Sequence, residues 1–188
     1  LARIVERHES LRTVFLAGAD GKPFQQVAHQ VSFSMERVDL RHLSPAAPPE
    51  EMERIAATEA KTAFDLTRDL MLRARLIRLD DDRHVLLVTK HHIASDGWSM
   101  DVLLDEMCRL YEAFRLGQDD PLPPLPIQYA DYSAWLAGWL HGDVLRDKLD
   151  YWQARLAGLP DLHALPLDRP RPPRRTINGG RHARSLVL

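Results

Sequence analysis

Residues 90–99 constrain this chain more than any other stretch, because two adjacent histidines stand where an apolar run gives way to polar residues. The apolar run is Val85-Leu86-Leu87-Val88, and the polar stretch reads Lys90-His91-His92-Ile93-Ala94-Ser95-Asp96-Gly97-Trp98-Ser99. Apolar residues at helical spacing then follow: Met100, Leu103, Leu104, Met107, Leu110, Tyr111 and Phe114. The order predicts strand, loop and helix, with the histidines held by a rigid strand and accessible from the loop.

The residues of the polar stretch differ in what they can do. Neighbouring strand side chains point to opposite faces, so one of His91 and His92 should face a cleft while the other packs on the far side. Asp96 is expected to cap the following helix or to hold a buried cation. Gly97 is expected to permit a backbone angle, or a close approach, that a Cβ would block. Trp98 is expected to pack at the helix start.

Composition excludes several classes of function. Adjacent strand histidines diverge, and no cysteine or HxxxH pattern lies nearby, so a metal site is disfavoured. The net charge of −2 favours neither nucleic acid nor an anionic membrane as a partner. The single cysteine, Cys108, is interpreted as a core residue, and one cysteine gives no disulfide framework, so a cytoplasmic setting is expected. No apolar run approaches the roughly 20 residues that span a bilayer.

The remaining pattern alternates strands and helices. We expect a first strand within 7–16 and further strands at about 23–28, 31–40, 71–79 and 84–92. Helices are expected at 1–9, from Ser44 or Glu50 to about 64, and at 99–117, 129–140 and 144–156. Asp20-Gly21 signals a hairpin, and residues 84–92 are expected to form a buried central strand. Two proline-rich stretches, 118–126 and 159–173, are expected to be irregular. Trp135, Trp139 and Trp152 are interpreted as core residues.

Three separate stretches resemble one family, the condensation domains of nonribosomal peptide synthetases. Residues 7–15 read RHESLRTVF and resemble its RHExLRTxF motif. Residues 91–99 resemble its HHxxxDGWS motif, which chloramphenicol acetyltransferase shares in part. Residues 129–135 read YADYSAW and resemble its YxDxAxW motif, with Ser133 where alanine is usual and Ala134 where valine is usual.

The resemblance implies an α/β fold, a sandwich like chloramphenicol acetyltransferase with a mixed sheet flanked by helices. The family domain has two such lobes, and its active site lies in a tunnel between them. Residues 1–158 would form the N-terminal lobe, without the family's first strand and helix, and residues 159–188 the proline-rich crossing and start of the second lobe. The family's first motif and its later motifs are absent from this chain.

The resemblance also implies a reaction, the formation of an amide bond between two carrier-bound thioesters. His92 takes the catalytic place, as a base for the attacking amine or as a group that holds it, with His91 as its structural neighbour. The backbone N–H of Gly97 would face the reacting carbonyl. Trp98 belongs to the same motif as structural support.

A buried carboxylate needs a cationic partner, so we expect Asp96 to pair with Arg12 or Arg7 and thereby to fix the histidine loop. The resemblance implies no metal and no directly bound cofactor, because partner carrier proteins bear the 4'-phosphopantetheine arm. The expected partners are peptidyl or aminoacyl carrier proteins, the second lobe and the adjacent synthetase modules.

Other interpretations stay open. The chain would be a non-catalytic fragment or a carrier-docking lobe if the second lobe is essential for activity. An epimerisation domain is a close variant, but Gly97-Trp98-Ser99 and the RHExLRT stretch favour condensation. A free-standing acyltransferase that uses acetyl-CoA shares the histidine motif but gives no reason for the other two. Heterocyclisation domains replace both histidines by aspartate and are disfavoured.

Overall fold

The computed structural model describes residues 1–43, 48–160, 166, 169–170 and 173–174. It divides into two compact units, Leu1–Leu140 and His141–Leu188, which are considered separately. Most of the predicted crossing at 159–188 lies outside the described residues. No helix in the described ranges is long and apolar enough to cross a membrane.

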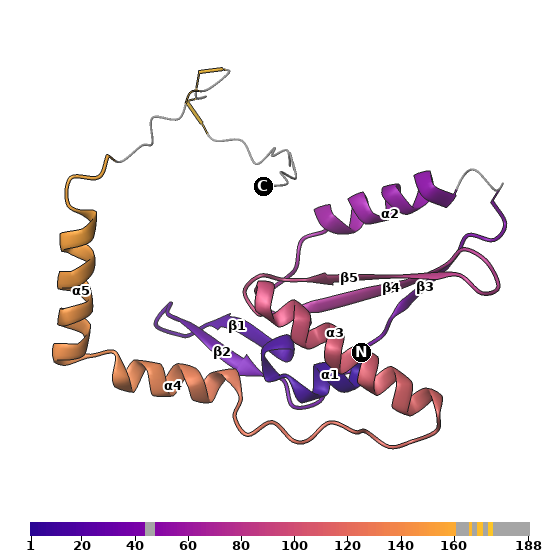
Figure 1. The fold of residues 1–188 in the computed structure, drawn as a ribbon, viewed down its shortest axis with the longest axis horizontal. Helices are drawn as coiled ribbons and strands as arrows, with labels where there is room; N and C mark the ends of the chain where they lie inside the picture. Colours follow the sequence, from indigo (N-terminus) through magenta and orange to yellow (C-terminus); the bar gives the residue numbers. More distant parts are fainter. Residues whose placement is uncertain (44–47, 161–165, 167–168, 171–172, 175–188) are drawn as a thin grey trace, which may run out of the picture. The chain divides into compact units, whose positions relative to one another are not determined.

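The first unit is built on a mixed three-stranded sheet (Figure 1). Strand β4 (Leu72–Arg78) lies in the middle, with β3 (Glu36–Asp39) parallel to it on one side and β5 (His84–Lys90) antiparallel on the other. The mixed α/β class is therefore confirmed. The prediction that the strand before the histidines is buried and central is wrong, because β5 lies at the edge of the described sheet and its residues are exposed or half-buried.

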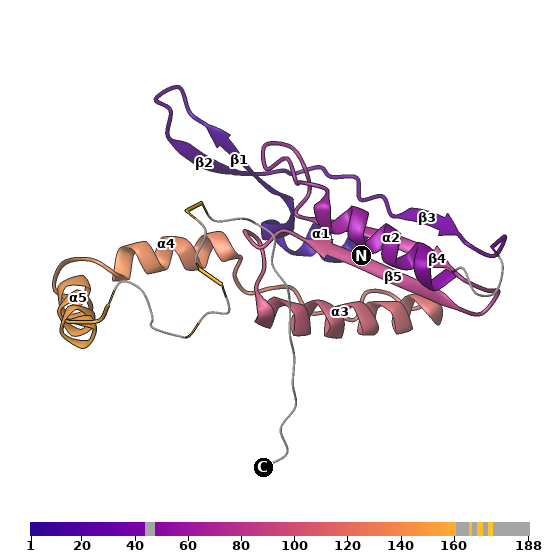
Figure 2. The same ribbon diagram turned by 90° about the horizontal axis from the view of Figure 1, so that it is seen from above.

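The apolar residues of β5 are explained by packing on both faces of the strand, and not by a central position in the sheet. Its residue Val88 packs with α1 (Ala2–Arg7) and α3 (Gly97–Arg115), in a cluster built on Ile4, Val5, Leu11, Leu72, Leu103 and Leu110. The next residue back, Leu87, packs in a second cluster with Leu40, Ile55 and Ile77, beneath α2 (Pro48–Lys61). Figures 1 and 2 show α2 and α3 on opposite faces of the sheet. A strand covered on both faces loses the polar alternation of a half-exposed one.

A separate hairpin joins β1 (Thr13–Ala17) to β2 (Pro23–Val27), with Thr13 opposite Val27. Gly21 takes a positive φ of 75° in the turn, so the predicted hairpin is confirmed. Glu9–Arg12 form the short 3-10 helix η1 between α1 and β1. The strand expected over 31–40 is shorter than predicted, because only Glu36–Asp39 pair with β4.

The later helices lie where the sequence predicts them. α3 ends before Gly117, whose φ of 69° suits a left-handed helix end. Residues 118–126 contain four prolines and have no regular structure. α4 (Tyr129–Trp139) follows in the first unit, and α5 (Gly142–Leu156) belongs to the second.

Several residues interpreted as core are exposed. Cys108 is exposed on α3. No residue of α4 or α5 is buried, so Trp135, Trp139 and Trp152 are exposed. Three ring pairs along α4 contact one another instead, and the last of them, Trp135 with Trp139, stacks at 5.7 Å between centroids. Helical spacing predicts a stripe of apolar residues, but not which part of a protein covers that stripe.

A buried carboxylate attaches α2 to the sheet. Only 5% of the Glu59 side chain is exposed, and its oxygens lie 2.7 Å from Arg73 Nε and 3.1 Å from Arg75 Nε. The Arg73 guanidinium also lies 3.8 Å from the centre of the Phe64 ring. Two cations on β4 therefore compensate the charge that α2 buries.

We expect Glu59→Ala to lower the free energy of unfolding by about 3 kcal/mol, because it leaves the half-buried Arg73 guanidinium without its carboxylate and leaves Arg75 with the exposed Glu36 alone. Urea denaturation measures this change. Glu53→Ala on the same helix is the matched control, since Glu53 is exposed, and should change stability little. Equal effects of the two substitutions would show that the charge cluster does not hold α2.

Candidate active site

The histidine stretch is a compact turn between β5 and α3, not a continuation of the strand. β5 ends at Lys90, whose Nζ donates to the carbonyl oxygen of Asp96 at 2.8 Å. Within the turn, the Ala94 N–H donates to the carbonyl oxygen of His91 at 3.1 Å. The turn therefore closes on itself before the helix begins.

His91 is the inner of the two histidines. Its backbone N–H donates to the Met71 carbonyl at 3.0 Å, and its Nδ1 accepts from the Ile93 N–H at 3.0 Å. Its ring meets the Phe64 ring edge-on, at 5.5 Å between centroids and 76° between planes. Through these contacts His91 anchors the turn to the segment between α2 and β4.

His92 is exposed, and among the described residues only one of its ring nitrogens has a hydrogen-bond partner. Its Nδ1 lies 2.6 Å from the Ser95 carbonyl oxygen. A carbonyl only accepts, so Nδ1 carries the proton and donates it, and the lone pair of the neutral ring lies at Nε2. The short turn thus fixes both the orientation of the ring and its tautomer. The predicted division between the two histidines is present, although the turn produces it rather than strand alternation.

His92 opens into a cavity of about 490 Å³. The lining is mixed, with polar groups on several elements: His8, Ser10, Ser95, Asp96, Ser99, Gln128, Tyr129 and Tyr132, beside the apolar Ile93, Ala94, Leu125 and Ile127. All three motifs noted in the sequence contribute to this lining. No group of His, Cys, Asp and Glu in the described residues could hold a metal ion.

Asp96 caps α3. Its Oδ1 accepts from the Ser99 hydroxyl at 2.6 Å and from the Ser99 N–H at 2.9 Å, while the Asp96 N–H donates to Ser99 Oγ at 3.2 Å. These bonds from Ser99 hold the pKa of the exposed Asp96 carboxyl below its usual range. The capping alternative is confirmed, and the carboxylate is not buried.

The predicted ion pair between Asp96 and an arginine is wrong, because both candidates have other partners. Arg7 Nε lies 2.9 Å from Glu106 Oε1, and its Nη1 donates to the Pro123 carbonyl at 2.6 Å. Arg12 Nη1 donates to the Ala28 carbonyl at 2.7 Å, and its Nη2 lies 3.5 Å from Glu9. An exposed carboxylate that caps a helix needs no distant cation, so the premise of a buried Asp96 fails.

Two further predictions for the motif are wrong. Trp98 is 81% exposed, so it does not pack at the helix start. Gly97 does not have a positive φ, and a Cβ built on it meets nothing within 4 Å. Neither residue is constrained by its neighbours in the described part of the chain.

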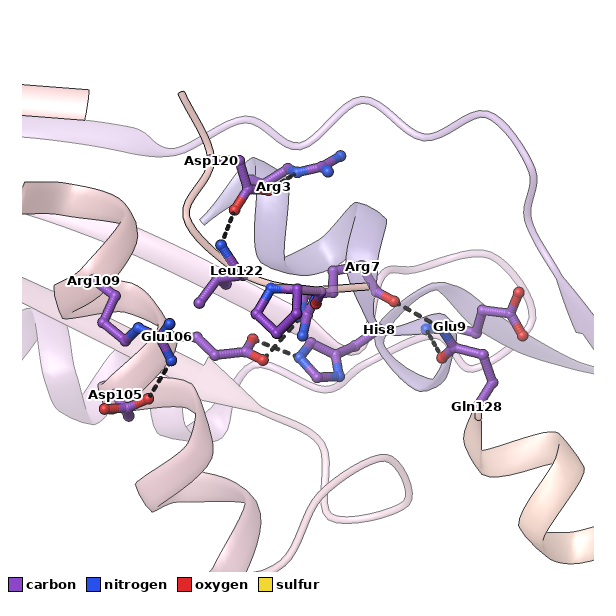
Figure 3. Close-up of polar contacts among 11 residues, drawn as sticks. Arg3, Arg7, His8, Glu9, Asp105, Glu106, Arg109, Asp120, Leu122 and Gln128 are labelled. Atoms are coloured by element: carbon purple, nitrogen blue, oxygen red, sulfur yellow. Dashed lines mark hydrogen bonds and ion pairs between the residues drawn. The ribbon is translucent and has the colours of Figure 1, made fainter. Parts of the chain in front are cut away.

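A buried cluster that the sequence did not predict lies beside the cavity (Figure 3). Glu106 on α3 is 6% exposed, and its second oxygen lies 2.6 Å from His8 Nε2. Glu106 stands three residues after Leu103 and four before Leu110, both buried. An acidic residue inside the apolar stripe of a helix was the signal for such a cluster, because a buried carboxylate requires partners.

Gln128 connects the start of α4 to the RHE stretch. Its Oε1 accepts from the Glu9 N–H at 3.2 Å, and its Nε2 donates to the Arg7 carbonyl at 3.0 Å. Its own N–H donates to the Asp131 carboxylate at 2.8 Å (Figure 3 draws the side-chain bonds). Gln128, the residue before the third motif, therefore joins the first motif to the start of α4, and Glu106 joins the first motif to the helix that follows the second.

This arrangement matches a known family along nearly the whole chain. The model of the condensation domain matches residues 1–187. The chain belongs to the condensation-domain family. A linear gramicidin synthase of Brevibacillus parabrevis is 49% identical over 176 residues, which is 94% of this chain but 3% of that protein. Phosphinothricin tripeptide synthetase PhsB of Streptomyces viridochromogenes is 44% identical over 178 residues, 95% of this chain and 15% of its own length.

Solved structures confirm the family fold. The X-domain from teicoplanin biosynthesis superposes with a TM-score of 0.75 at 33% identity and covers 90% of this chain. The same domain in complex with OxyB gives 0.72 at 34% identity. This chain spans 37% of the length of the X-domain structure.

We expect the two histidines to show opposite tautomers in long-range ¹H–¹⁵N spectra of the imidazole rings. His92 should carry its proton on Nδ1, and His91 should carry it on Nε2, because His91 Nδ1 accepts from a backbone N–H. His84, which is exposed at the start of β5, serves as the reference ring. A proton on Nε2 of His92 would contradict the geometry of the turn.

The helix cap gives a prediction with a defined pH range. The Asp96 pKa is depressed below 3.8, so its contribution to stability is present above that pH and is lost as pH falls through the folded pKa. Asp96→Ala should therefore melt at a lower temperature than the wild type at pH 7, with the gap closing in acid. Asp96→Asn, which still caps, should lose less at pH 7. Thermal melts across this pH range measure both variants.

Proposed function

We propose that this chain supplies the histidine wall of a site that joins two carrier-bound thioesters through an amide bond. The observation that carries the proposal is the free Nε2 of His92, fixed by the turn and open to a 490 Å³ cavity. Family membership and the relatives in peptide synthetases support it. The substrates are an acyl or peptidyl donor thioester and an aminoacyl acceptor.

The reaction needs one proton acceptor. The amine of the aminoacyl substrate attacks the carbonyl carbon of the donor thioester. A C–N bond forms, and the C–S bond of the thioester breaks. The amine proton passes to His92 Nε2, and from there to the departing thiolate. Histidine titrates in the range where such transfers occur at neutral pH, so the residue type suits the step.

The neighbours of His92 have supporting roles in this proposal. His91 and Asp96 are positioning residues, because the first anchors the turn and the second fixes the start of α3. Arg7 and Arg12 hold the RHE stretch that forms another part of the cavity. The Gly97 N–H, among the first four of α3, has no acceptor within the helix and would donate to the oxygen of the tetrahedral intermediate.

The proposed partners are carrier proteins that bear 4'-phosphopantetheine arms, together with the rest of a two-lobe domain and the adjacent synthetase modules. The arm belongs to the partners, and the chain itself binds no cofactor in this proposal. The exposure of His92 at the cavity, and the exposed Trp98 on the lining of a smaller neighbouring cavity, are consistent with a wall that another surface completes.

A second candidate is a docking module without chemistry. The solved complex of the teicoplanin X-domain with OxyB shows that a domain of this fold forms a protein complex. The orientation of His92 favours catalysis over docking, because a docking surface has no need to fix a tautomer.

The first test is mass spectrometry of dipeptide formation with the full-length protein that carries this chain. Donor and acceptor carrier proteins, each loaded with an aminoacyl thioester, are the substrates. His92→Ala should lower the rate by about 100-fold or more, because the proton acceptor is lost. His84→Ala, a histidine on β5 outside the cavity lining, should leave the rate unchanged.

Full dipeptide formation by His92→Ala would contradict the assignment. An inert wild-type protein that still binds carrier proteins would favour the docking function instead.

A further inference from the structure

His8 faces the same cavity as His92, but the reaction described above gives it no role. The residue comes from the loop between α1 and η1, far in sequence from the histidine turn. It also lines a smaller cavity of about 160 Å³ behind that turn. About a quarter of its side chain, 24%, is exposed, so the ring is accessible from the cavity.

The ring of His8 is held in one orientation (Figure 3). Its Nε2 lies 2.6 Å from Glu106 Oε2, and the Glu106 side chain is only 8% exposed. The other oxygen of Glu106 lies 2.9 Å from Arg7 Nε, and Arg7 is held in turn by the Pro123 carbonyl. A carboxylate fixed by a guanidinium cannot follow a moving ring, so the bond to Glu106 fixes His8.

The bond to Glu106 also decides which nitrogen of His8 is free. A carboxylate only accepts, so Nε2 carries the proton, and the neutral ring keeps its lone pair at Nδ1. His92 has the reverse arrangement, with its lone pair at Nε2. Two oriented imidazoles therefore line the cavity, and within the described ranges each has a partner at one ring nitrogen and none at the other.

A primary amine matches this pair of acceptors. Before it attacks, the neutral α-amine of an aminoacyl group has two N–H bonds and one lone pair. The thioester carbonyls at the reacting centre only accept, so the amine is the group there that offers strong donors. One N–H is lost to His92 during the reaction, and the other needs a separate acceptor if the lone pair is to point at the carbonyl.

We propose that His8 Nδ1 accepts the second N–H of the attacking amine and so orients its lone pair toward the donor carbonyl. This inference rests on the proposed function. No bond forms or breaks at His8, and the N–H that it holds stays on the amide product. The Glu106 and Arg7 side chains act through His8 as positioning residues.

The test compares primary and secondary amines with His8→Gln in the full-length protein. Glutamine can still donate to Glu106 from its amide nitrogen, but it has no acceptor at the place of Nδ1. With a leucyl acceptor, the KM for the acceptor carrier should rise about three- to tenfold, the effect of one lost hydrogen bond. With an N-methylleucyl acceptor, which has a single N–H, His8→Gln should have the same KM as the wild type.

His8→Asn is the second variant, because its side-chain oxygen lies close to the place of Nδ1 while its contact with Glu106 is lost. The ratio of its KM values for the N-methylleucyl and leucyl acceptors should stay closer to the wild-type ratio than the ratio for His8→Gln does. Melting temperatures of both variants measure the structural part of the effect separately.

An equal change of KM for the two acceptors, or no change for either, would overturn the inference and leave His8 a structural contact. A wild-type protein that forms no amide overturns both proposals. Loss of activity in His92→Ala with normal kinetics in His8→Gln overturns this inference alone.

Discussion

The buried carboxylate of Glu106 is the interaction on which the arrangement of this cavity depends. It lies within the apolar stripe of α3, where an unpaired charge would cost several kcal/mol. Arg7 and His8 compensate it, and they reach it only if α1 and η1 lie against α3. Gln128 then ties α4 to the same backbone. The buried charge thus links α3 to the segment at the end of α1, and Gln128 joins the start of α4 to that same segment.

The histidine turn is fixed by bonds of a different kind. Its contacts are short in sequence: His92 to Ser95, Asp96 to Ser99, and Lys90 to Asp96. These local bonds set the shape of the turn, and the contacts of His91 with Met71 and Phe64 hold it against the rest of the unit. Glu106 positions His8, which lines the same cavity. Local bonds therefore orient the His92 ring, tertiary contacts orient the His8 ring, and both rings line the same cavity.

The exposed aromatic residues also show the difference between local and tertiary contacts. Trp98 and the rings along α4 are apolar surfaces that nothing in the described residues covers. The chain spans 37% of the solved X-domain structure. In the proposed function, the exposed rings belong to surfaces that the rest of a two-lobe domain would cover. The two buried clusters, by contrast, are formed by residues of this chain, one where α1, α3 and the sheet meet and the other beneath α2.

The sequence by itself determined the order of strands and helices, the hairpin at Asp20-Gly21, the cap at Asp96 and the family, because each depends on residues close together or on a fixed motif. Only the tertiary structure decided that β5 is an edge strand, that Arg7 pairs with Glu106 rather than Asp96, and that Trp135 and Trp139 are exposed. Periodicity shows which residues share a face, but not which element covers it. Charge shows that a buried carboxylate needs a partner, but only the packing of α1 against α3 selects His8 and Arg7.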